Sequence, residues 1–195
     1  MNSLRGFTLL ETLVWITVFT TTMIAISTSV LYFYRTSDAT IEQATALTST
    51  QRGIDEIVQV IREAAYSSVG AYPIVSLATS SLTFYANIDT DSSIERVRYY
   101  LSDTTLSVGI LNPVGDPASY VGTEDVSLIA DNIRNVSEGF DVFTYYDTNG
   151  DEMVDLSQID EVRFVTVTLV ADLDPNRAPV ITTLRSSAAM RNLIE

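Results

Sequence analysis

The first part of the chain carries two hydrophobic patterns in succession. From Thr12 to Tyr34 no residue is charged, and apolar side chains predominate throughout. A helix over that stretch, at about 1.5 Å per residue, is roughly 34 Å long, which is enough to cross a hydrocarbon core of about 30 Å. An ordinary secretory signal has a shorter apolar region. The pattern therefore predicts a transmembrane helix, with its segment at residues 7–34.

The second pattern is an amphipathic stripe that continues the first without a break. Apolar positions recur at spacings of three and four, which predicts a helix with one apolar face over residues 35–68. We expect one helix from about Thr8 to Ser67, with Gly53 as the only weak helix former in the stripe. A kink near residues 36 and 37, giving two helices, is the alternative. The stripe consists of Ile41, Ala44, Leu47, Gln51, Ile54, Val58, Ile61 and Ala65.

From Pro73 onward the pattern changes to a period of two in β-branched and aromatic residues. Clusters of Asp, Ser, Gly and Pro separate the runs, so each run is expected to be a strand. A long helix followed by strands predicts an α+β fold with a mostly antiparallel sheet, forming one β-rich globular domain at residues 69–195. The expected strands are 82–86, 94–101, 105–111, 126–129, 140–146, 162–171 and 180–185.

One acid lies near the start of the apolar segment. Glu11 follows the sequence RGFTLL at residues 5–10. A charge deep in a membrane helix costs about 2.5 to 3.5 kcal/mol on insertion scales, so an acid there is a functional hypothesis by default. A plain signal anchor with Glu11 at headgroup depth, favoured by the helix amino terminus, is the alternative.

These residues resemble the class III leader of type IV prepilins and type II secretion pseudopilins. The resemblance implies that residues 1–6 are a leader peptide, that a prepilin peptidase cleaves after Gly6, and that Phe7 is then N-methylated. It also implies an assembly role for Glu11, which would meet the methylated amine of a neighbouring subunit. The chain has no proline before Pro73, unlike many subunits of filament shafts, and this favours a minor subunit.

Softer similarities continue into the β-rich part, at residues 82–85, 96–101 and 190–192. In these segments and in its length of 195 residues, the chain resembles the J class of pseudopilins and the W class of minor pilins. The resemblance implies a type IV pilin-like fold, with the long helix packed on the sheet. It implies a non-enzymatic subunit that helps initiate or cap a type II secretion pseudopilus or a type IV pilus.

The same resemblance implies the partners and the location. The partners are the prepilin peptidase, the inner-membrane assembly platform, membrane lipid, and other minor and major subunits contacted through the N-terminal helix. The location is the cytoplasmic membrane in a single pass with the amino terminus inside, and the filament tip after assembly. A membrane-anchored extracellular adhesin or receptor that joins no filament is the alternative.

Charge and composition narrow the chemistry. The formal net charge is −14, with 11 basic and 25 acidic residues. Basic side chains supply most non-specific affinity for nucleic acid, so we expect no direct nucleic-acid partner. With no cysteine and no histidine, catalytic sites that use either residue are excluded, as are histidine-ligated zinc sites. No spacing singles out a pair of catalytic acids, and we expect no enzyme activity.

One loop matches part of a calcium-binding pattern. Asp147, Asn149, Asp151 and Asp155 stand at positions 1, 3, 5 and 9 of an EF-hand-type loop. Position 6 is not glycine and position 12 is Gln158, so the match is incomplete. A polar hairpin turn with solvated acids is the alternative. Ca²⁺ is thus the one possible cofactor, and the Asp89–Asp91 pair is a weaker candidate that a simple turn explains.

Overall fold

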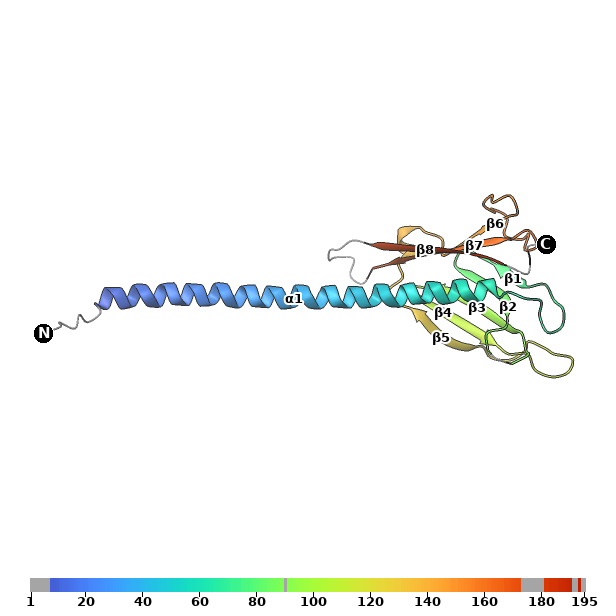
Figure 1. The fold of residues 1–195 in the computed structure, drawn as a ribbon, viewed down its shortest axis with the longest axis horizontal. Coiled ribbons are helices and arrows are strands. Elements are labelled where there is room, and N and C mark those ends of the chain that lie inside the picture. The colour runs from blue at the N-terminus through green and yellow to red at the C-terminus, as the bar shows by residue number, and fades with distance from the viewer. Residues whose placement is uncertain (1–7, 90, 173–180, 191–192, 194–195) are drawn as a thin grey trace. The chain divides into compact units, whose positions relative to one another are not determined.

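The computed structural model describes residues 8–89, 91–172, 181–190 and 193. For residues 35–43, 45 and 46 it describes the backbone alone. It consists of a long helix α1, Leu9–Arg62, followed by strands and one short helix (Figure 1). The chain divides into two compact units, residues 1–44 and residues 45–195. The elements after α1 are β1 (Ile74–Leu77), β2 (Ser81–Ala86), β3 (Glu95–Ser102), β4 (Thr105–Leu111), β5 (Asp125–Ala130), α2 (Asn135–Glu138), β6 (Phe143–Tyr146), β7 (Phe164–Ala171) and β8 (Thr182–Ala189).

In the first unit, threonine hydroxyls are satisfied within α1 itself. The hydroxyl of Thr17 donates to the carbonyl of Leu13 at 2.9 Å, and that of Thr21 donates to the carbonyl of Thr17 at 2.8 Å. Thr20, Thr22 and Thr28 make equivalent bonds. Because each hydroxyl has an acceptor one turn back, these polar residues leave no unpaired donor on an apolar helix.

In the second unit, the last turns of α1 bury one face. The predicted stripe is confirmed at Ile54, Val58 and Ile61, which are buried, whereas Gln51 is exposed. Thr50 and Ile57 are buried in addition, so the apolar face is rotated slightly from the predicted one. The side chain of Ile41 lies outside the described residues.

Helix α1 ends at Arg62, earlier than the predicted Ser67. The N–H groups of Glu63 and Ala64 bond to carbonyls three residues back, which tightens the final turn. The chain then joins the end of β2, because Ala64 bridges Ala86 and the N–H of Ala65 donates to the carbonyl of Tyr85 at 2.9 Å. Pairing with the sheet replaces the next helical hydrogen bonds.

Strands β1 to β5 form an antiparallel sheet in sequential order. The register places Phe84 opposite Val97 and Val97 opposite Ile110, so apolar residues line one face across three strands. Strand β1 was not among the predicted strands. Its four residues directly follow Pro73 and include a register shift between Ile74 and Ser76, so they show no clear alternation.

Strands β6 to β8 form a separate antiparallel sheet in the order β6-β7-β8. The predicted strand at 140–146 is shorter than expected, because α2 precedes it and Gly139 ends α2 with a φ of 70°. The strand begins at Phe143, which pairs with Val167, just after the carbonyl of Val142 accepts the N–H of Thr168 at 2.8 Å. Strand β8 runs on to Ala189, beyond the predicted end at Arg185, because β7 supplies partners for it up to Phe164.

The α+β class with antiparallel sheets is confirmed, although the β-rich part holds two sheets where one was predicted. One hydrophobic cluster includes Ile57 of α1, Phe84 and Tyr99 of the first sheet, and Val165 of the second. The sheets also meet at the β1–β2 turn, where the Thr79 carbonyl accepts N–H groups of Val142 and Phe143. The core therefore lies between the end of α1 and both sheets.

Candidate functional site

The apolar part of α1 is the first candidate site. The segment Leu9–Tyr34 is long and apolar enough to span a membrane, and none of its residues is buried. Its large side chains are exposed, including Leu9 at 83% and Trp15 at 63%. Apolar surface on this scale needs lipid or other helices around it. The predicted processing residues Gly6 and Phe7 lie outside the described residues.

Glu11 lies in the first turn of this apolar segment and is exposed. Its backbone N–H donates to the hydroxyl oxygen of Thr8 at 3.3 Å, which partly satisfies the amino end of the helix. The partial positive charge of a helix amino terminus favours an acid there. Thus Glu11 is the one carboxylate of the Leu9–Tyr34 segment.

The predicted calcium loop is a turn held by its own hydrogen bonds. Oδ1 of Asp147 accepts the N–H groups of Asn149 at 2.8 Å and Asp151 at 2.9 Å, and its Oδ2 accepts from the Asn149 amide at 3.1 Å. Gly150 supports the bend with a φ of 84°. These bonds, led by the one from Asp151, lower the pKa of the Asp147 carboxyl.

Asp155, the fourth predicted ligand, makes different contacts. Its Oδ1 accepts from the hydroxyl of Ser157 at 2.6 Å, and its Oδ2 accepts from the amide of Gln158 at 3.1 Å. These bonds, led by that from the Ser157 side chain, lower the pKa of Asp155. The structure thus links Asp147, Asn149 and Asp151 directly, and engages Asp155 elsewhere. Calcium binding by this loop remains a prediction.

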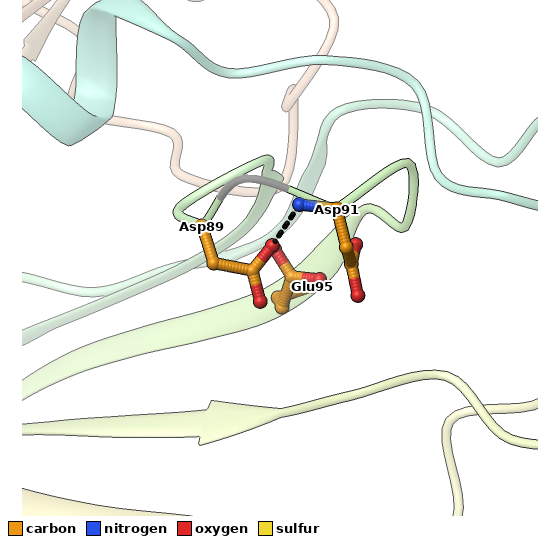
Figure 2. Close-up of side chains that lie close together, drawn as sticks. All are labelled: Asp89, Asp91 and Glu95. Atoms are coloured by element: carbon orange, nitrogen blue, oxygen red, sulfur yellow. Dashed lines mark hydrogen bonds between the residues drawn. The ribbon is translucent and has the colours of Figure 1, made fainter.

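A different set of acids converges at the β2–β3 connection. Asp89, Asp91 and Glu95 each offer one carboxylate oxygen, and these oxygens lie within 4.8 Å of one another in the part of the chain that the structure describes. Figure 2 shows the carboxylate of Glu95 between those of the two aspartates in this view. Burial raises the pKa of the Glu95 carboxyl, and the charges of Asp89 and Asp91 add to the rise.

Glu95 was not among the predicted site residues, although its position in the alternation of β3 could have indicated it. The alternation along β3 places Glu95 on the same face as Val97 and Tyr99. An acid at a position that the period of two assigns to the core is unusual and marks a site. The aspartates alone fit a simple turn.

On the opposite face of the first sheet, two arginines share one acid. Arg98 donates from Nε and Nη2 to Oε2 of Glu124, at 3.0 and 2.6 Å, and Nη2 of Arg96 lies 3.6 Å from Oε1. Gly109 makes room, since a Cβ there would lie 2.5 Å from Oε2 of Glu124. The Arg98 guanidinium also lies 4.2 Å from the centre of the Tyr100 ring.

No protein-family model matches the chain, and no curated protein matches its sequence.

Proposed function

We propose that the chain is a minor subunit of a type IV pilin-like filament, either a type II secretion pseudopilus or a type IV pilus. One observation carries the proposal: the apolar segment Leu9–Tyr34 is exposed along its length and holds a single acid, Glu11, in its first turn. The leader-like residues 5–10 directly precede that acid. A plain anchor accounts for the apolar length, and its helix amino terminus accounts for an acid in the first turn, but it gives no reason for the leader-like residues.

The exposed apolar surface of Leu9–Tyr34 would be covered in two successive environments. In the membrane, lipid covers the apolar side chains; in a filament, the helices of neighbouring subunits do so. Glu11 is costly in either environment unless a cation faces it. The amino terminus left by cleavage after Gly6 and methylation of Phe7 is a cation of suitable size. We propose that Glu11 pairs with that amine on a neighbouring subunit.

The proposed role is structural and non-enzymatic. The prepilin peptidase processes the chain, and the inner-membrane assembly platform moves it from the membrane into the filament. Other minor subunits and the major subunit contact it through the N-terminal helix. The amino terminus is inside and the β-rich domain is extracytoplasmic, with the filament tip as the final location. We propose no enzyme activity and no nucleic-acid partner for it.

The test replaces Glu11 by glutamine and measures processing and assembly separately. The Glu11→Gln variant keeps the size of the side chain and loses the charge, so cleavage should proceed while recovery in the sheared filament fraction falls at least tenfold. Glu56→Gln is the matched control, because Glu56 is an exposed acid of α1 outside the apolar segment. Recovery of Glu11→Gln at the control level would contradict the assembly role.

A further inference from the structure

Glu95 occupies a position of β3 that its neighbours assign to the core. The register places Glu95 opposite Ala86, and Val97 and Tyr99 follow it on the same face. All four residues are buried, and Glu95 itself is only 1% exposed. An ionised carboxylate is held at such a position only with a compensating partner.

The two oxygens of Glu95 differ in their partners. Oε2 accepts the backbone N–H of Ile88 at 3.1 Å. Oε1 is buried and has no hydrogen-bond partner among the residues that the structure describes. Both ion pairs found among the described residues involve arginines and end on Glu124, so no arginine neutralises Glu95 there. A buried acceptor of this kind requires an explanation such as a bound ion.

Asp89 and Asp91 bring their carboxylates to the same place from the β2–β3 connection. Oδ1 of Asp89 accepts the N–H of Asp91 at 2.8 Å, and Oδ1 of Asp91 accepts the N–H of Ser93 at 2.6 Å. These bonds use one oxygen of each aspartate and hold the two side chains against the backbone of the connection; Figure 2 shows the bond between Asp91 and Asp89. The second oxygen of each takes part in neither bond.

We propose that Asp89, Asp91 and Glu95 bind one divalent cation, and that the cation is Ca²⁺. The ligands are all oxygens, as hard cations prefer, and their mutual separation of at most 4.8 Å suits an ion whose opposite ligands lie up to about 5.2 Å apart. The exposed aspartates leave room for water and carbonyl oxygens to complete the six to eight ligands typical of Ca²⁺. Mg²⁺ needs a stricter octahedral arrangement.

The two aspartates of the cluster are exposed to solvent. Asp89 also lines an open hollow of about 500 Å³, together with Ile88, Ile110, Val121 and Asp125. An ion can therefore enter without rearrangement of the sheet. Once bound, it would join the β2–β3 connection to the first residue of β3, and Ala86 opposite Glu95 bridges Ala64 just after α1. Binding should therefore stabilise the folded domain.

The full-length protein in detergent micelles, freed of metal by a chelator, is titrated with CaCl₂ by isothermal calorimetry, and its thermal unfolding is followed with and without CaCl₂. We expect one Ca²⁺ per chain and a higher unfolding temperature with CaCl₂. MgCl₂ should bind at least tenfold more weakly. Absence of binding up to millimolar CaCl₂, or binding of MgCl₂ as tight as that of CaCl₂, would overturn the proposal.

Single substitutions test whether Ca²⁺ binds at the cluster of Asp89, Asp91 and Glu95. Glu95→Gln should weaken Ca²⁺ at least tenfold, and Asp91→Asn, on the exposed connection where folding is least affected, should do the same. Asp103→Asn, at an exposed acid of the β3–β4 turn with a φ of 57° that asparagine also adopts, is the matched control and should bind Ca²⁺ as the unaltered protein does. Asp155→Asn tests the loop at residues 147–155 as the other candidate. Equal affinity in Asp91→Asn and the unaltered protein, or a loss confined to Asp155→Asn, would refute the site. The experiment involves no peptidase or filament, so its outcome is independent of the proposed function.

Discussion

Gly53 of α1 lies so close to Ile129 that a Cβ on Gly53 would be 2.7 Å from Cγ2 of Ile129. Real Cβ contacts are essentially never this short, so one side must move when any side chain is introduced. Ile129 is β-branched and stiff at χ1, which limits how it can yield. The glycine that looked like a weak point in the helical stripe is therefore explained by packing.

Gly53→Ala should destabilise the domain despite the better helix propensity of alanine. The gain from propensity is about 1 kcal/mol, whereas overpacking typically costs about 1–3 kcal/mol. We expect a net loss of about 1 kcal/mol in the free energy of urea unfolding. The double variant Gly53→Ala with Ile129→Ala should show favourable coupling, because Cγ2 is removed. Stabilisation by Gly53→Ala alone would contradict the close packing.

Glu124→Gln should destabilise the domain modestly and in a salt-dependent way. Two arginines, Arg96 and Arg98, face this carboxylate on a partly exposed surface. Surface ion pairs of this kind contribute about 0.5–1 kcal/mol, and salt screens them. Urea unfolding at low and high salt measures the effect, with the neighbouring exposed Asp125→Asn as control. Equal effects of the two substitutions at both salt concentrations would contradict a specific role for Glu124.

Tyr145→Phe should weaken the connection between the two sheets. The buried Tyr145 hydroxyl donates to the carbonyl of Ala78 at 2.8 Å and lies 3.2 Å from that of Ser81. Loss of such a bond costs about 1 kcal/mol at neutral pH. The measurement is the difference in unfolding free energy between the variant and the unaltered protein.

The difference in unfolding free energy between Tyr145→Phe and the unaltered protein should become smaller at alkaline pH. Burial raises the pKa of Tyr145 above the usual value near 10. The stabilisation is therefore complete below pH about 10 and is lost as pH rises further, because the unfolded chain ionises first. Burial also raises the pKa of Tyr99, so some alkaline destabilisation should persist in Tyr145→Phe. A difference that is constant from pH 8 to pH 11 would contradict this account.

Periodic patterns were sufficient to predict the elements with regular faces. The three-and-four spacing predicted the buried face of the last turns of α1, where Ile54, Val58 and Ile61 lie in the core, but not the end of the helix at Arg62. The period of two predicted β4 at its observed bounds, Thr105–Leu111. It did not predict where β8 ends, since Ser and Ala have weak strand preference and are held by pairing with β7.

Sites that depend on tertiary placement were harder to predict. The acidic loop at 147–155 matched a spacing pattern, but in the structure Asp155 bonds to Ser157 and Gln158. The cluster of Asp89, Asp91 and Glu95 has no known spacing motif, and it forms because β3 begins beside the turn that holds the aspartates. Only the alternation in β3 could have pointed to Glu95.

Gly6→Val should leave the chain as an unprocessed precursor in the membrane. A leader peptidase that cleaves after a small residue has no room for a branched side chain at that position, so cleavage should fall at least tenfold. Immunoblotting of membrane fractions measures the ratio of precursor to mature chain, and Ser3→Val in the same leader is the control. Efficient processing of Gly6→Val would refute the leader assignment.

The most direct measurement is the intact mass of the membrane-extracted protein, with sequencing of its amino-terminal fragment, in cells with and without their prepilin peptidase. Our account predicts that residues 1–6 are absent and Phe7 is methylated when the peptidase is present, and that Met1 or Asn2 is the first residue when it is absent. A chain that keeps residues 1–6 in both strains would be a plain signal-anchored domain and would contradict the filament-subunit assignment.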